Sequence, residues 1–280
     1  MLKSELFYCK NKDTYPPFKN GLYLEEYFLK HKTDTVRKYI PCLWTNFQIE
    51  SWFQSKKLEM QSILDQWVIS NPSNTGYFTV VQYDDAILLK LPPNTLVYGA
   101  CSGDIPIPLI YQDLTLTLEN KPKKSFHQKE ILCSFVGTNT HSVRTQIINK
   151  FNKTFKIISN NSWSSVVPVN NQEIFIDTTL NSKFALAPRG YGRSSFRFFE
   201  IFKLNTIPVY IWDDIEWLPF KETINYSKLC ISINIKDIDN LETILKNITE
   251  EQYDNFLYYY NQIKHYFDVA GMSELICSEV

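Results

Sequence analysis

Apolar segments that alternate with helical patterns dominate the second half of this chain and limit its fold most strongly. From Glu130 onward, apolar runs of strand length recur at residues 131–137, 155–159, 184–188, 207–212 and 229–235. Helical patterns occupy intervals between them at residues 142–151, 194–204 and 240–248. Strands that are apolar throughout are typical of a parallel sheet with helices on both faces. The sequence therefore predicts a doubly wound α/β domain over residues 126–262.

The first half has shorter apolar runs, which are separated by turn residues. Candidate strands lie at residues 36–46, 76–85, 85–93 and 95–104, and residues 51–68 have the spacing of an amphipathic helix. We expect a separate α/β domain over residues 1–125. Residues 111–128 end in a polar, lysine-rich sequence, which predicts a solvated linker. The aromatic run at residues 248–270 predicts one long helix, and residues 263–280 a helical tail that returns to the first domain.

Charge and cysteine usage exclude several function classes. The chain has 29 basic and 30 acidic residues and a net charge of -1, so it lacks the positive potential expected of a nucleic-acid binder. Six cysteines form no CxxC pair and the four histidines supply no zinc spacing, which predicts no metal site. No run has the pattern of a signal peptide or membrane span. We expect a cytoplasmic protein, or a domain whose anchor lies outside this sequence.

Residues 184–200, FALAPRGYGRSSFRFFE, concentrate the chemical information. Only 8 of the 280 residues are glycine, and Gly190 and Gly192 both lie here. Around them, at the start of a predicted helix, stand two arginines and two serines: Arg189, Arg193, Ser194 and Ser195. A helix N-terminus with guanidinium and hydroxyl donors is suited to phosphate oxygens. The segment predicts a phosphate site at the carboxyl end of a strand, where doubly wound sheets bind ligands.

Glu200 follows in the same predicted helix, among phenylalanines. A buried carboxylate needs partners, and the two hydroxyls of a ribose are suitable ones. The alternative is structural: a serine caps the helix, Arg193 and Arg197 pair with Glu200, and the glycines form a turn. The segment matches neither a P-loop nor a GxGxxG fingerprint.

Several motifs in this order resemble the exostosin family of glycosyltransferases. They are PRGYGRSSFRFFE, TIPVYIWDDIEWLPF, the run from ITEEQY to HYF, and the upstream CSFVGTNTHSVRTQII, which together cover about residues 130–265. The first 125 residues match only loosely, as in GDIPIPLIY. The resemblance implies a glycosyltransferase B fold, in which two Rossmann-like domains face each other across a cleft and the second domain holds the nucleotide-sugar donor.

The resemblance also implies an inverting, metal-independent transferase that moves a sugar from a nucleotide diphosphate sugar, here a UDP-sugar, to a hydroxyl of a glycan acceptor. No further cofactor and no nucleic-acid partner is implied, and the oligomeric state stays open. By position, Arg189, Arg193, Ser194 and Ser195 would hold the diphosphate and Glu200 the ribose. The facing loop would be lined by Gly137, Thr138, Asn139 and Arg144. Asp213 and Asp214 would approach the donor sugar, or else form a turn or helix cap.

Inverting transfer needs a base that takes the proton of the acceptor hydroxyl. Asp84, Asp85 and Asp104 follow apolar strands of the first domain and are the predicted candidates, although aspartates also end strands as turn formers. His31 and His127 lie in polar surroundings and are weaker candidates. Two alternatives to this function stay open. One is a fucosyltransferase-like enzyme that uses a GDP-sugar, and the other is a non-catalytic module that binds nucleotides or carbohydrates.

Overall fold

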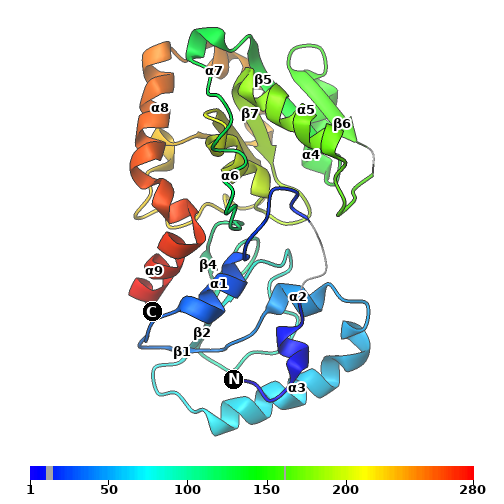
Figure 1. The fold of residues 1–280 in the computed structure, drawn as a ribbon, viewed down its shortest axis with the longest axis vertical. Helices are drawn as coiled ribbons and strands as arrows, with labels where there is room; N and C mark the ends of the chain where they lie inside the picture. Colours follow the sequence, from blue (N-terminus) through cyan, green and yellow to red (C-terminus); the bar gives the residue numbers. More distant parts are fainter. Residues whose placement is uncertain (11–14, 161) are drawn as a thin grey trace. The chain divides into compact units, whose positions relative to one another are not determined.

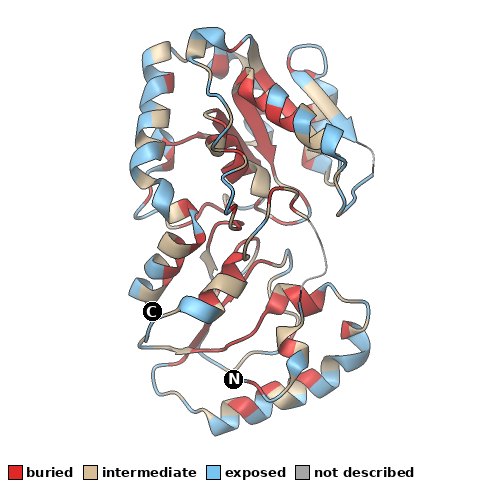
Figure 2. Cartoon of the chain, viewed as in Figure 1, coloured by how far each residue is buried: buried red, intermediate tan, exposed pale blue. Residues whose placement is uncertain are grey.

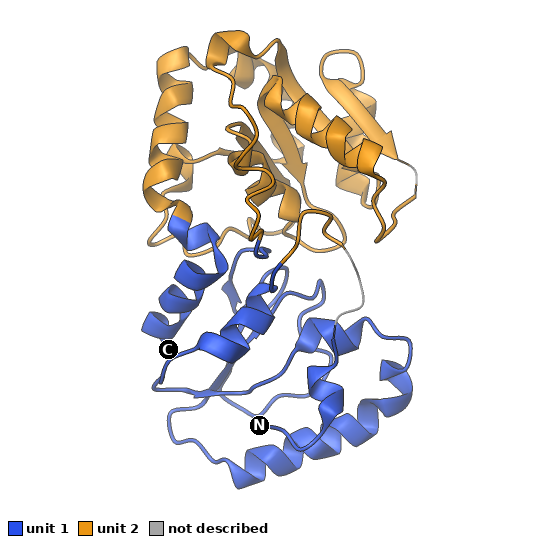
Figure 3. Ribbon diagram, viewed as in Figure 1, with its two compact units in different colours: residues 1–12, 21–112, 265–280 blue, residues 13–20, 113–264 orange. Residues whose placement is uncertain are grey.

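The structure is a computed structural model of the 280-residue chain, and it describes residues 1–10, 15–160 and 162–280 (Figure 1). The chain forms two compact units (Figure 3). Unit 1 comprises Met1–Lys12, Gly21–Gln112 and His265–Val280, and unit 2 comprises Asp13–Asn20 and Asp113–Lys264. Each unit contains a parallel sheet, so the chain belongs to the mixed α/β class that was expected.

Unit 2 is built on five parallel strands, whose order in the sheet is β6-β5-β7-β8-β9. Their bounds are β5 Ile131–Thr138, β6 Lys156–Asn160, β7 Ser182–Pro188, β8 Ile207–Trp212 and β9 Ile231–Asn234. Strands β7 and β8 are buried along nearly their whole length, and β5 is buried at its centre (Figure 2). The predicted parallel sheet is therefore confirmed.

Helices cover both faces of this sheet. On one face, α4 (Ser142–Phe151), α7 (Leu241–Asn247) and α8 (Glu250–Ile263) share a core with the strands. Phe184, Val209 and Tyr253 belong to this core and are buried almost completely. On the other side, α5 (Val169–Leu180) contacts β5 and β7, and α6 (Phe196–Lys203) contacts β7 and β8. Unit 2 is thus doubly wound.

Local sequence signals determine where α6 begins and which face it buries. The hydroxyl oxygen of Ser195 accepts the backbone N–H of Arg197 at 3.3 Å and caps the helix. Phe198, Phe199 and Phe202 recur at helical spacing and are all buried. The cap and this apolar face hold the N-terminus of α6 just beyond the carboxyl end of β7.

Unit 1 contains a smaller parallel sheet of four strands in the order β1-β2-β3-β4. Their bounds are β1 Lys38–Tyr39, β2 Tyr77–Val81, β3 Thr95–Gly99 and β4 Ile105–Pro106. Helix α1 (Leu24–His31) packs against β2 and against α9 (Val269–Glu279). Helices α2 (Trp44–Gln48) and α3 (Phe53–Ser70) supply Trp44, Phe53 and Leu64 to a second core. Short 3-10 turns complete the two units at Glu5–Tyr8, Phe126–Gln128, Tyr226–Lys228, Ile235–Asn240 and Lys264–Phe267.

The units differ in extent from the predicted domains 1–125, 126–262 and 263–280. Unit 2 begins its main segment at Asp113, and the segment Asp13–Asn20 also belongs to it. The tail from His265 belongs to unit 1, where α9 packs against α1. Within the described residues, no helix combines the length and hydrophobicity that a membrane span requires.

Two predicted elements of secondary structure were wrong, and one helix was missed. Residues 85–93 form an irregular connection between β2 and β3, because they supply no backbone pairing to the sheet. Helix α5, which the sequence analysis did not identify, connects β6 to β7. The long helix expected over residues 248–270 ends at Ile263, and a 3-10 turn separates it from α9.

Residues 111–128, predicted as a solvated linker, are about half exposed, but from Asp113 onward they belong to unit 2 and are attached to it. Leu118 is fully buried. The ammonium group of Lys123 donates to the backbone oxygens of Leu118 and Lys203, and that of Lys124 donates to Asn181. Lys123 and Lys124 are therefore anchored to unit 2 by hydrogen bonds.

Glu25 of α1 connects three elements of unit 1. Its carboxylate accepts the backbone N–H and hydroxyl of Thr45, at the start of α2, and the backbone N–H of Gln82, just after β2. The side chain is buried, with 2% of the residue exposed. Desolvation outweighs these hydrogen bonds and raises the pKa of Glu25 from 4.5 to about 7.

We expect this raised pKa to make unit 1 less stable as pH rises. Between pH 4.5 and 7 the folded state keeps a proton on Glu25 that the unfolded state has released, so the free energy of unfolding falls across this range. The loss attributable to Glu25 should be on the order of 1–3 kcal/mol. In Glu25→Gln, urea unfolding should show a shallower fall between pH 5 and pH 8. Glu59→Gln, an exposed glutamate of α3, should retain the wild-type slope, and equal slopes in all three proteins would contradict this role.

Candidate donor-binding site

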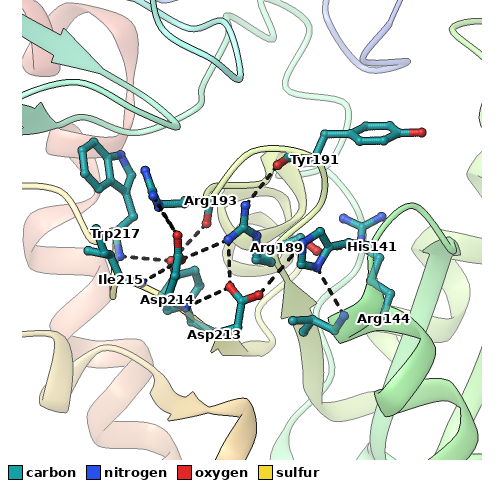
Figure 4. A network of polar contacts seen from close by, with 11 residues as sticks. His141, Arg144, Arg189, Tyr191, Arg193, Asp213, Asp214, Ile215 and Trp217 are labelled. Atoms are coloured by element: carbon teal, nitrogen blue, oxygen red, sulfur yellow. Dashed lines mark hydrogen bonds and ion pairs between the residues drawn. The ribbon is translucent and has the colours of Figure 1, made fainter.

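The register between β7 and β8 brings the predicted arginines and aspartates of unit 2 together. Pro188 pairs with Ile211, and the backbone N–H of Arg189 donates to the carbonyl of Ile211 at 3.1 Å. Arg189, just past β7, therefore lies beside Asp213, just past β8. Figure 4 shows the resulting network of polar contacts at this edge of the sheet.

Arg189 is the centre of this network. Its Nη1 donates to Asp213 at 2.8 Å and to Asp214 at 3.0 Å, and its Nη2 donates to the carbonyl of Tyr191 at 3.1 Å. Only 13% of the side chain is exposed. Its Nε is buried and has no hydrogen-bond partner among the described residues. A buried donor without a partner is costly, so this guanidinium has unused capacity for an oxygen ligand.

Arg193 holds the second aspartate. Its Nε and Nη2 both lie 2.7 Å from Oδ2 of Asp214, and its guanidinium lies 5.4 Å from the centre of the Trp217 ring. Partial burial disfavours the charged form of Asp214, but hydrogen bonds from Arg193 and the Ile215 N–H, with the charge of Arg189, outweigh it. The pKa of Asp214 is therefore held well below its ordinary value.

Arg144 has a different role from the other two arginines. It donates to three carbonyls, those of Thr138 at 2.8 Å, Arg189 at 3.0 Å and Pro188 at 3.3 Å. Gly190 leaves room for it, because a Cβ atom there would lie 3.1 Å from Nη2 of Arg144. Arg144 thus ties the end of β5 to the end of β7, and its charge adds to the positive potential of the site.

The predicted loop residues Gly137, Thr138 and Asn139 complete β5 and lead toward α4. The N–H of Asn139 donates to the carbonyl of Asn160, and its side-chain oxygen accepts the Thr145 hydroxyl at 2.9 Å. The loop is therefore fixed against both β6 and α4, on the same edge of the sheet as Arg189.

The two predicted serines lie just before α6, and the predicted glutamate lies within it. Ser195 caps the helix as described, so the structural alternative for this serine is present, and Ser194 is buried beside it. Glu200 is buried, with 4% of its side chain exposed, and its carboxylate lies 3.9 Å from Nη1 of Arg197. Arg193 pairs with Asp214 instead of Glu200.

The three predicted base candidates lie in unit 1. Asp84 and Asp85 are both exposed in the turn that follows β2. The carboxylate of Asp104 accepts the backbone N–H of Val97 at 2.8 Å, and its own N–H donates to the Val97 carbonyl. Asp104 therefore closes the turn between β3 and β4, so this carboxylate has a structural role of its own.

His141 is a site residue that the sequence analysis did not identify. It stands immediately before α4, and its Nδ1 accepts the N–H of Val143 at 3.2 Å, which caps that helix. Its Nε2 lies 4.0 Å from Oδ2 of Asp213 (Figure 4). Its place in the turn between a predicted strand and a predicted helix, opposite the arginine segment, is the signal that could have identified it.

A metal site held by the protein needs several ligand side chains close together. Over residues 1–10, 15–160 and 162–280, no three His, Cys, Asp or Glu side chains come close enough together to hold an ion. Asp213 and Asp214 are an adjacent pair of carboxylates, and both accept hydrogen bonds from Arg189. The groups that contact these two carboxylates in the network include the guanidiniums of Arg189 and Arg193.

Comparison with curated proteins identifies short regions of similarity to glycosyltransferases. The chain is 30% identical over 95 residues to the Arabidopsis thaliana protein "Probable glycosyltransferase At5g03795", which is 34% of this chain and 18% of that protein. It is 35% identical over 69 residues to a probable glucuronoxylan glucuronosyltransferase of the same plant, which is 25% of this chain and 14% of that protein. It is 36% identical over 73 residues to the Caenorhabditis elegans "Exostosin-1 homolog", which is 26% of this chain and 19% of that protein. Each match thus spans less than one fifth of the relative.

The family match covers more of the chain than these pairwise alignments. The sequence model of the exostosin GT47 domain family matches residues 97–248, from β3 through α7. This range contains the whole network of Arg189, Arg193, Asp213, Asp214 and His141. Because it is also more than half of the 280 residues, the chain belongs to the exostosin GT47 family of glycosyltransferases.

Proposed function

We propose that this protein transfers a sugar from a nucleoside diphosphate sugar, of the UDP class, to a hydroxyl group of a glycan acceptor, with inversion and without a metal ion. The observation that carries the proposal is the position of Arg189 and Arg193, which stand between the end of β7 and the capped N-terminus of α6. Both guanidiniums already hold anionic oxygens in the form of Asp213 and Asp214.

The network supports diphosphate binding through its supply of donors. Guanidinium groups bind phosphate oxygens in the same geometry in which they bind carboxylates. The two aspartates hold Arg189 and Arg193 in place before a ligand arrives, so little side-chain entropy would be lost on binding. In the bound state the diphosphate would share these arginines with the aspartates, and Nε of Arg189 would be available for one further oxygen.

Transfer from a nucleoside diphosphate sugar requires stabilisation of the departing diphosphate. Fixed positive groups aimed at the leaving oxygens lower the barrier because they are already oriented when charge develops. Arg189, Arg193 and the N–H groups of the first turn of α6 would supply this stabilisation. We assign Glu200 to the ribose hydroxyls, because it is the only carboxylate within α6.

The second chemical requirement is a base for the acceptor hydroxyl. We keep Asp84 and Asp85 as the candidates, because they follow β2 closely and are exposed, whereas Asp104 is committed to its own turn. The acceptor hydroxyl has one proton to give up and needs one base, so we assign this role to only one of the two.

Binding of uridine diphosphate should depend on Arg193 and not on a divalent metal ion. We expect Arg193→Ala to weaken UDP binding by about 10- to 100-fold, the loss of a charge-assisted pair of hydrogen bonds. Arg193→Lys keeps the positive charge but loses the forked pair of donors. Its affinity for UDP should lie between those of the wild type and Arg193→Ala. Isothermal titration calorimetry in the presence of EDTA measures the UDP affinity of all three proteins.

Lys246→Ala is the control for this experiment, because Lys246 is an exposed lysine of α7 paired with Glu242. It should bind UDP like the wild type. Unchanged affinity in Arg193→Ala would rule out this site. Loss of binding on addition of EDTA would instead contradict metal independence, and tighter binding of GDP than of UDP would contradict the donor class.

Only one member of the aspartate pair should affect transfer. With an acceptor identified by a glycan screen, either Asp84→Asn or Asp85→Asn should reduce the transfer rate by about 10²- to 10⁴-fold while UDP affinity stays unchanged. The other variant should be nearly silent. Asp104→Asn should lower the thermal stability of the protein, because it weakens the turn held by Val97. Near-wild-type rates in both Asp84→Asn and Asp85→Asn would place the base elsewhere.

A further inference from the structure

Of the four histidines of the chain, all within the described residues, His141 is the one in the arginine and aspartate network. Its Nε2 lies 4.0 Å from Asp213, which accepts a hydrogen bond from Arg189 at 2.8 Å. About 23% of the side chain is exposed, so the ring is partly shielded but open to a ligand and to protons. His141 comes from the turn between β5 and α4, whereas the aspartates follow β8 and Arg189 follows β7.

Hydrogen bonding assigns the protons of the neutral ring. Because Nδ1 accepts the backbone N–H of Val143 at 3.2 Å, it carries no proton in this arrangement. The proton of the neutral imidazole must then be on Nε2, the atom that points toward Asp213 (Figure 4). His141 therefore already presents a donor to the place where anionic oxygens gather.

The surroundings of His141 favour its neutral form in the free protein. Burial is the main cause, and the positive charges of Arg189 and Arg144 add to it, while Asp213 and Asp214 act in the opposite direction. The net result is a pKa of His141 below its ordinary value of 6.5. The elements around the ring contribute three guanidiniums and two carboxylates, which leaves one net positive charge. These groups are Arg144, Arg189, Arg193, Asp213 and Asp214.

A nucleoside diphosphate would reverse the sign of this local charge. UDP adds about three negative charges at neutral pH, and a UDP-sugar adds about two. One net positive charge cannot neutralise either ligand, and extra negative charge close to an imidazole favours its protonated form. Of the groups around the site, His141 is the one whose ordinary pKa lies near neutrality.

We propose that His141 is a donor-site residue that takes up a proton from solvent when a nucleoside diphosphate binds, so that an imidazolium joins Arg189 and Arg193 around the diphosphate. This inference rests on the proposed function. The departing UDP carries one more negative charge than the UDP-sugar, and the imidazolium would stabilise that additional charge through Nε2–H. The added proton goes to Nδ1, because Nε2 already carries one, so the hydrogen bond from the Val143 N–H to Nδ1 is released while UDP is bound. The proton stays on His141 during transfer, and when UDP leaves it returns to solvent and the bond to Val143 forms again.

Calorimetry tests this proton linkage directly. UDP is titrated into the 280-residue chain at pH 7 in two buffers whose ionisation enthalpies differ, and the difference in observed enthalpy gives the number of protons taken up. We expect between about 0.3 and 1 proton per UDP in the wild type. The variant His141→Asn should abolish this uptake and weaken UDP binding by about 3- to 10-fold at pH 6.5, with a smaller effect at pH 8.

The variant is chosen to preserve the local structure. Asparagine is a good N-cap residue, so it can still accept the Val143 N–H, but it does not titrate. His127→Asn is the matched control, because His127 is an exposed histidine of the same unit that pairs with Glu250. The His127→Asn protein should take up as many protons on binding UDP as the wild type.

The outcomes distinguish this inference from the proposed function. If UDP binds without proton uptake, or if uptake persists in His141→Asn, the role of His141 is wrong while the donor site stands. If neither UDP nor a UDP-sugar binds the wild-type protein, the proposed function fails and the inference fails with it. A loss of uptake in His127→Asn as well would also overturn the assignment to His141.

Discussion

The parallel pairing of β7 with β8 is the constraint on which the site of unit 2 depends. Because Pro188 lies opposite Ile211, Arg189, one residue further on, and Asp213, two residues further on, reach the same edge of the sheet. The turn after β7 then returns the chain into α6, which keeps Arg193 near Asp214. A shift of this register by one residue would turn these side chains to the other face of the sheet. The core that fixes the register, with Phe184 and Val209 buried at its centre, therefore also fixes the chemistry.

Much of unit 2 could be predicted from its sequence, because its strands are apolar throughout and its helices have a clear period. Helix α5 was missed because VNNQEIFIDTTL has four polar residues among its first five and no side-chain cap, so tertiary contacts with β5 and β7 define it. Unit 1 was harder to predict. Residues 85–93 have strand composition, yet Gln48 binds the backbone of Ala86 and Leu88 and holds them outside the sheet. Such side-chain contacts from a distant segment have no local signal.

The candidate site, like the fold, could be predicted only in part from the sequence. Glycine spacing and clustered arginines predicted the segment around Arg189, because these features are local in sequence. The partners of the arginines could not be derived in the same way, since Asp213 and Asp214 lie more than 20 residues further along the chain. Arg144 was expected to line the ligand loop, and the structure shows that its hydrogen bonds go to backbone carbonyls. His141 was overlooked because a single histidine before a helix is indistinguishable from an ordinary cap until its neighbours are known.

The central claim is that the edge of unit 2 at Arg189 and α6 binds the diphosphate of a sugar donor. The most direct measurement is a crystal structure of the protein with UDP, grown without divalent metal ions. The account predicts density for both phosphates within hydrogen-bond distance of Arg189 and Arg193 at the N-terminus of α6, with the ribose next to Glu200. UDP bound elsewhere, or phosphates held by a metal ion with both arginines still closed on Asp213 and Asp214, would contradict it.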